Sequence, residues 1–147
     1  MKRDKVGILL VLMLFIGVCG LLYPSVSQYW NSKTQTRAVE NYQEILNSLK
    51  QEDYEVFFQE ADRYNVELSE LKNPLLNYRQ LDGYNEILNI NGNGIMGYVS
   101  IPKLGVEIPI YHGISAEVLN VACGHLEGTS LPVGGENTHC VLSAHRG

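Results

Sequence analysis

The sequence predicts a membrane-anchored α+β protein, in which a transmembrane helix and a helical stalk precede the first part of an incomplete β-barrel. Three observations support this fold class: an uncharged apolar run over residues 6–23, apolar residues at helical spacing up to residue 71, and short strand-like segments after residue 91. A length of 147 residues allows one domain beside the membrane anchor.

The apolar run over residues 6–23 is interpreted as an uncleaved signal anchor. As a helix it would span about 27 Å, which is close to the thickness of the hydrocarbon layer. Residues 1–5 carry three basic side chains, so we predict that they form a cytoplasmic tail and that the rest is exported. A cleaved signal peptide is the main alternative, but no small-residue cleavage pattern follows Leu22. Pro24 is expected to mark the exit from the membrane helix.

The charge of the exported part is acidic. The whole chain has a net charge of −5, and beyond residue 5 it carries 8 basic and 15 acidic side chains. This balance argues against nucleic-acid binding, which requires a basic face. The three cysteines cannot form a fully paired set of disulfides, as expected for a surface protein that does not rely on them.

Residues 24–71 are predicted to be helical. Two groups of apolar residues recur at three- and four-residue spacing, with a weak break near residues 51–53. We interpret them as packing or stalk helices rather than as a binding surface. The groups are Tyr42, Ile45, Leu46 and Leu49, followed by Val56, Phe57, Ala61, Tyr64 and Leu68.

Residues 91–147 are predicted to contain short strands joined by turns, which is typical of a β-barrel. Asn-Gly-Asn-Gly at 91–94 is a turn signal, and strands are expected over residues 95–101 and 106–111. Because proline cannot donate to a sheet, Pro102 and Pro109 are expected at edges or bends.

One brief helix and one further strand complete this pattern. Ser115 is expected to cap a short helix that ends at Val121, with Gly124 beyond its end. A loop rich in Gly, Thr, Ser and Pro then leads to a strand over residues 139–144, which delivers His145 to a glycine-flanked end.

Two motifs in this last stretch resemble the class C, pilus-assembling sortases of Gram-positive bacteria. They are Gly-His-Leu-Glu-Gly-Thr-Ser-Leu-Pro at 124–132 and Ser-Ala-His-Arg-Gly at 143–147. Upstream, Gly-Ile-Met-Gly-Tyr at 94–98, Ile-Pro-Lys-Leu at 101–104 and Pro-Ile-Tyr-His-Gly at 109–113 fit the same family. The resemblance implies that residues 91–147 are the N-terminal part of a sortase-type β-barrel.

The resemblance also implies a function. Class C sortases are cysteine transpeptidases that cleave LPXTG-like sorting signals and join pilin subunits through a Lys amine or attach them to the cell wall. His145 falls on the position of the catalytic general acid and base. The family's nucleophilic Cys and its Arg are expected to lie beyond the C-terminus, so we predict a fragment that is inactive alone and poorly folded past Gly94.

Partners and location follow from the same resemblance. The expected partners are LPXTG-like sorting signals of pilin or surface proteins and the membrane, without nucleic acid, and no cofactor or metal is implied. We expect a single-pass protein of the cell membrane, with its domain on the extracellular side. The alternative function is a non-catalytic, membrane-anchored surface or scaffold protein in which His145 is a relic.

Residues 72–90 are predicted to be a lid-like or linker region. Class C sortases carry a lid here, anchored by an acidic-Pro-aromatic motif, whereas this chain has Asn-Pro-Leu at 73–75, without the acid and the ring. Tyr78 and Tyr84 are alternative groups that could stack in the groove. A plain surface linker is an equally good interpretation.

The cysteines of the exported part are not predicted to be nucleophiles. Because side chains alternate along a strand, Cys140 should point away from His145 and behave as a small core residue. Cys123 ends the short helix beside Gly124. His112 is expected to be a hydrogen-bonded turn histidine. A zinc site is disfavoured because its five candidate ligands lack paired spacing; they are Cys123, His125, His139, Cys140 and His145.

Overall fold

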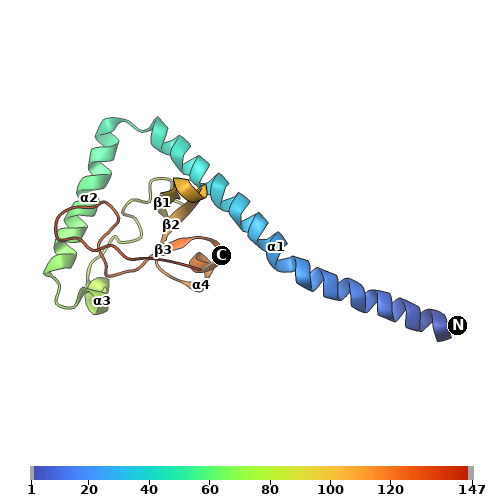
Figure 1. The fold of residues 1–147 in the computed structure, drawn as a ribbon. Helices are drawn as coiled ribbons and strands as arrows, with labels where there is room; N and C mark the ends of the chain where they lie inside the picture. The colour runs from blue at the N-terminus through green and yellow to red at the C-terminus, as the bar shows by residue number, and fades with distance from the viewer. Residues whose placement is uncertain (1, 146–147) are drawn as a thin grey trace. The chain divides into compact units, whose positions relative to one another are not determined.

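The computed structural model describes residues 2–145, with side chains from residue 5 onward, and divides into two compact units, Met1–Thr34 and Gln35–Gly147 (Figure 1). Residue 1 of the predicted cytoplasmic tail lies outside the described residues, as do the last two residues of the motif at 143–147.

In the first unit, residues 2–34 are helical and form the first part of α1 (Lys2–Ser48). By length and composition, α1 contains a segment apolar enough to cross a membrane, and the large apolar side chains of residues 6–26 are exposed. Pro24 lies inside α1, so the expectation that the helix ends there is wrong. A proline removes one backbone hydrogen bond, and a helix of 47 residues retains enough others to continue through it.

In the second unit, α2 (Gln51–Glu70) follows the end of α1 after a break at residues 49–50, beside the predicted one. The carboxylate of Asp53 accepts a 3.2 Å hydrogen bond from the backbone N–H of Lys50 and so caps the start of α2. Ala61, Tyr64 and Leu68 are buried, which confirms the apolar face expected from their spacing.

Within residues 2–145, four strands form an open sheet in the order β1 (Ile95–Ile101), β2 (Val106–His112), β3 (Cys123–His125) and β4 (Leu142–Ala144). The β1–β2 hairpin is antiparallel, β2 and β3 are parallel, and β3 and β4 are antiparallel. The two predicted hairpin strands are confirmed, and a short 3₁₀ helix, η2 (Pro102–Leu104), connects them. Pairing with β3 begins at Ile110, so the missing N–H of Pro109 costs no hydrogen bond to β3.

The connection from β2 to β3 contains α4 (Ala116–Val121), which confirms the expected short helix. The hydroxyl of Ser115 accepts a 3.4 Å hydrogen bond from the N–H of Val118 and caps it. A Cβ on Gly124 would collide with the carbonyl oxygen of Gly113, so this position of β3 requires glycine.

Residues 72–90 pack against the rest of the second unit and are therefore more than a surface linker. They contain α3 (Pro74–Asn77) and a 3₁₀ turn, η1 (Tyr78–Gln80). Farther along, Tyr84, Ile87 and Leu88 are buried, so Tyr84 belongs to the core and not to a surface groove.

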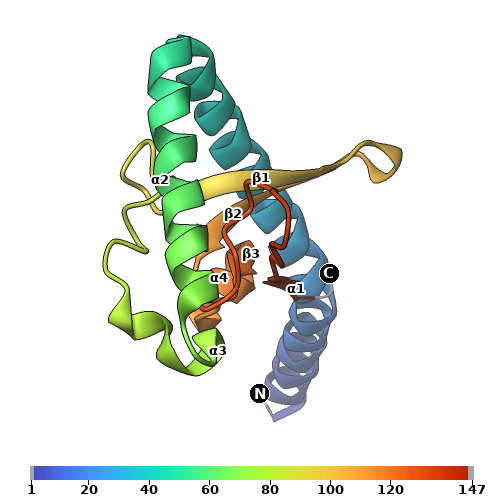
Figure 2. The ribbon, with the colours of Figure 1, turned by 90° about the vertical axis from the view of Figure 1, so that its left-hand side faces the viewer.

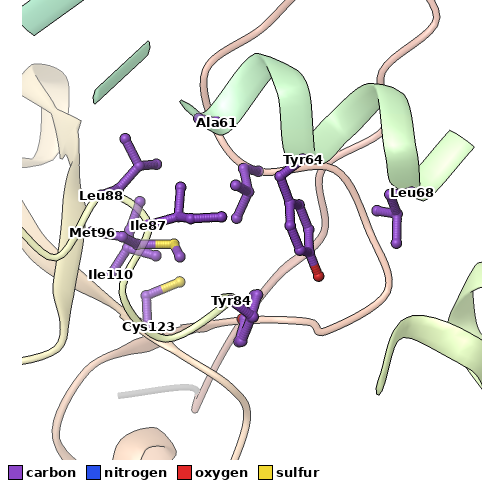
Figure 3. Packing of buried hydrophobic residues seen from close by; sticks show 10 residues of the cluster. Ala61, Tyr64, Leu68, Tyr84, Ile87, Leu88, Met96, Ile110 and Cys123 are labelled. Carbon is purple, nitrogen blue, oxygen red and sulfur yellow. The ribbon is translucent and has the colours of Figure 1, made fainter. Parts of the chain in front are cut away.

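The core lies between α2, the segment that precedes β1, and one face of the sheet (Figures 2 and 3). Figure 3 shows the side chains of α2 meeting those of the sheet, with the ring of Tyr64 directed toward Tyr84. The buried cluster comprises Ala61, Tyr64, Leu68, Tyr84, Ile87, Leu88, Met96, Ile110, Cys123 and Leu131.

Candidate functional site

His145 directly follows β4 and is exposed. Its strand is held by β3, because Cys123 pairs with Ala144 and His125 pairs with Leu142. Alternation along the strand places the side chain of His145 on the same face as Ser143, opposite to Ala144 and Cys123. The imidazole therefore stands at a sheet end, accessible to solvent, on the face away from the thiol of Cys123.

The strand that carries His145 is shorter than expected. β4 covers Leu142–Ala144, whereas residues 139–141 precede it without strand pairing. Cys140 is exposed, so its expected role as a small core residue is wrong. Leu142 is likewise 37% exposed, so residues 2–145 leave this part of β4 and the residues before it only partly covered.

Both thiols near this strand favour the protonated form. Burial raises the pKa of Cys123. Cys140 is exposed as a residue, but neighbouring atoms partly desolvate its sulfur, and this desolvation together with the nearby Cys123 raises its pKa. A cysteine that acts as a nucleophile needs the opposite environment, one that stabilises the thiolate. Neither thiol has the electrostatic surroundings of an activated nucleophile.

His125, named only as a possible zinc ligand from the sequence, is fully buried at the end of β3. Its Nδ1 lies 2.9 Å from the hydroxyl of Tyr84, and its Nε2 lies 2.9 Å from the carbonyl oxygen of Ser130 and 3.2 Å from Oγ1 of Thr129. Burial lowers the pKa of His125. A histidine inside a Gly-Thr-Ser loop motif was the available signal, but only the fold shows these partners.

His112, the last residue of β2, is a hydrogen-bonded histidine, as predicted. Its Nδ1 lies 3.0 Å from the carbonyl oxygen of Gly94, and its Nε2 lies 2.8 Å from that of Ile87. The Tyr84 ring stands edge-on to it, at 5.1 Å between centroids. His112 thus ties the end of β2 to the turn before β1.

The lid-like segment contacts the loop after β3. The hydroxyl of Tyr78 donates to Oε2 of Glu127, and Gly128 packs against the backbone of α3. Because β3 and β4 are antiparallel, His145 lies beside the start of β3, whereas Glu127 and Gly128 follow its end. These contacts therefore lie at the opposite end of the β3–β4 pair from His145.

The residues considered for zinc do not form a ligand set. His125 is engaged by Tyr84, Thr129 and Ser130, and Cys123 lies in the apolar core. Across the described part of the chain, no group of three or more His, Cys, Asp or Glu side chains could hold a metal ion.

Comparison with family models identifies a match to the sortase domain over residues 99–147. Among solved structures, sortase C1 from Streptococcus agalactiae is 39% identical, with a TM-score of 0.62, and the match covers 76% of this chain and 58% of that one. Sortase C from Streptococcus pneumoniae is 36% identical, with a TM-score of 0.59 and coverage of 76% and 56%.

A third match is Clostridium perfringens sortase C in an intermolecular complex with the C-terminal cell wall sorting signal motif. It is 40% identical, with a TM-score of 0.58 and coverage of 76% of this chain and 53% of that one. The chain thus spans less than 60% of the length of these solved proteins. A comparison with curated proteins gives no match.

Proposed function

The chain belongs to the sortase family, with class C sortases among its solved relatives, and we propose that it is the N-terminal part of a cysteine transpeptidase that processes LPXTG-like sorting signals. The observation that carries this proposal is the exposed imidazole of His145 at the end of β4, inside the matched sortase region. An exposed strand end is where a substrate peptide can reach a general acid.

In the proposed reaction, a cysteine thiolate attacks the carbonyl carbon of the Thr–Gly bond. His145 protonates the departing amine as the bond breaks, and a thioester remains. The amine of a pilin Lys then attacks the thioester and passes a proton to His145, which was deprotonated in the first step, and the thiolate leaves as the amide bond forms. An arginine stabilises the oxyanion that develops in both steps.

The nucleophile of this reaction is not among the cysteines of the chain. Cys123 lies on the core side of β3, opposite to His145, and burial raises its pKa. Cys140 also has a raised pKa and lies two residues before the start of β4. The 147-residue chain is therefore proposed to be inactive by itself, because covalent catalysis has no route without its nucleophile.

The substrate and location are supported by the relatives and by α1. A C. perfringens sortase C complex contains the C-terminal cell wall sorting signal motif, so a signal of that kind is the proposed substrate class. The apolar segment of α1 would hold the protein in the cell membrane as a single-pass anchor, with the N-terminus cytoplasmic and the catalytic unit outside.

The first experiment incubates the purified chain with an LPXTG peptide and follows cleavage and adducts by mass spectrometry. We expect neither cleavage nor a thioester. Turnover that survives Cys123→Ala and Cys140→Ala, but is lost in His145→Ala, would contradict the proposal that the nucleophile is missing.

The second experiment completes the domain by joining residues 35–147 to the part of S. agalactiae sortase C1 that this chain does not cover. The chimera should cleave the peptide, and His145→Ala should abolish cleavage while the exposed control His139→Ala retains it. A folded chimera that cleaves equally well without His145, or does not cleave at all, would instead favour a non-catalytic surface or scaffold protein.

A further inference from the structure

His125 has no role in the proposed reaction, yet its ring is hydrogen-bonded through both nitrogens beside the strand that leads to His145. Both of its ring nitrogens have partners at 2.9 Å, the Tyr84 hydroxyl on one side and the Ser130 carbonyl oxygen on the other. A fully buried polar ring of this kind has a single favourable arrangement of protons, because an unpaired buried group is costly.

That arrangement follows from the partners. The carbonyl oxygen of Ser130 can only accept, so Nε2 carries the proton and donates to it. The Tyr84 hydroxyl lies 2.9 Å from Nδ1 and 3.2 Å from the backbone carbonyl oxygen of His125, and we assign its hydrogen to the nearer acceptor, Nδ1. The Tyr84 oxygen in turn accepts a 3.1 Å hydrogen bond from the N–H of Gly113. The ring is thus neutral, with its proton on Nε2.

The residues held by this ring also hold the chain that enters β4. Oγ1 of Thr129 accepts from the N–H of Val141 at 3.2 Å, and Oγ of Ser130 accepts from the N–H of His139 at 3.1 Å. The N–H of Ser130 returns a 3.0 Å hydrogen bond to the carbonyl oxygen of His139. The loop therefore fixes residues 139–141 although they lack strand pairing.

We propose that His125, as the neutral tautomer protonated on Nε2, is a positioning residue that sets the path of residues 139–141 and thereby the place of His145. The inference rests on the proposed function, in which His145 is the general acid. The position of His145 matters only for that role. An apolar side chain of similar size would fill the space but leave the carbonyl oxygen of Ser130 without its ring donor, and the Tyr84 hydroxyl would keep only the backbone carbonyl oxygen of residue 125 as an acceptor.

The experiment uses the full chain in detergent micelles, labelled with ¹⁵N at its four histidines. One ring should show the nitrogen shifts of an Nε2–H tautomer, and these signals should disappear in His125→Gln. In His125→Leu, the N–H groups of His139 and Val141 should exchange about tenfold faster, and the ring signals of His145 should move.

His125→Gln is the conservative rescue, because its amide can still donate to the Ser130 carbonyl oxygen, and exchange at His139 and Val141 should stay within about threefold of the wild type. Where His125→Leu does not fold, Thr129→Val replaces it, with Thr129→Ser as its rescue, since only the serine variant keeps the acceptor for Val141.

Two results would overturn the inference: an Nδ1–H tautomer at His125, or variants without the donor that leave both the amide exchange and the His145 signals unchanged. Neither measurement requires catalysis. If either result is found while the chimera still cleaves the peptide through His145, only the positioning role of His125 is overturned. If the chimera folds but does not cleave, the proposed function is overturned.

Discussion

The hydroxyl of Tyr78 donates a 3.0 Å hydrogen bond to Oε2 of Glu127, and this contact fastens η1 to the loop that follows β3. Beside it, a Cβ on Gly128 would lie 2.8 Å from the Cα of Leu75 and 2.9 Å from the carbonyl oxygen of Pro74. The segment expected to be a lid or linker is therefore attached through a tyrosine and a glycine, in place of an acidic-Pro-aromatic motif.

Tyr78→Phe should lower the free energy of unfolding by about 1–2 kcal/mol, because the half-buried carboxylate of Glu127 loses its donor. Hydrogen exchange over residues 74–80 should become faster. Denaturant unfolding and exchange mass spectrometry measure the two effects. Tyr54→Phe is the control, since it removes a hydrogen bond to the Leu46 carbonyl oxygen between α1 and α2. Equal exchange over residues 74–80 in both variants would contradict the attachment.

Gly128→Ala should destabilise the protein by about 2–4 kcal/mol, because it adds a contact with the α3 backbone to the strain of a positive φ. Gly134→Ala separates the two causes: Gly134 has φ +80°, close to the +81° of Gly128, but open space around its Cβ position. This control should cost only about 1–2 kcal/mol in the same unfolding assay. Equal losses of unfolding free energy in the two variants would show that Gly128 does not pack against the backbone of α3.

Acidification should destabilise the second unit through His125. Burial lowers its pKa below 6.5, so below that pH the unfolded chain takes up a proton that the folded chain excludes. The stability that the neutral ring of His125 contributes is fully present above pH 6.5. As the pH falls below that value, the free energy of unfolding decreases by at most about 1.4 kcal/mol per pH unit through this group.

Unfolding curves at pH 7.5 and 5.5 measure this dependence. His125→Gln should be less stable at pH 7.5 and lose less stability on acidification than the wild type. The exposed His139→Gln should keep the wild-type dependence. An unchanged slope in His125→Gln would assign the acid sensitivity to other groups.

The two thiols of the second unit should differ in reactivity. Cys140 is exposed and Cys123 is only 6% exposed, so a charged maleimide should modify Cys140 and spare Cys123 in the native chain. Because its pKa is raised, Cys140 should react more slowly at neutral pH than a free thiol. The measurement is mass spectrometry in a Cys19→Ser background, with Cys140→Ser as the control. Modification of native Cys123 at a comparable rate would contradict its burial.

Local patterns were sufficient for the elements whose causes are local. The turn residues before Ile95 and the alternation from Val106 to Tyr111 predict the hairpin, and the Ser115 cap predicts α4. The spacing of Ala61, Tyr64 and Leu68 predicts the buried face of α2. The role of His145 came from a motif and stays a prediction, although the structure places this residue at an exposed strand end.

The sequence by itself determined the apolar segment, the paired helices, the hairpin, the capped helix and the family, because turn chemistry, periodicity and motif spacing are properties of neighbouring residues. Only the tertiary structure decided that His125 and Tyr84 are bonded partners, that Cys140 is exposed, and that residues 72–90 pack on the loop after β3. These features depend on which distant segments meet and on which faces another layer covers, and no short stretch of sequence records either.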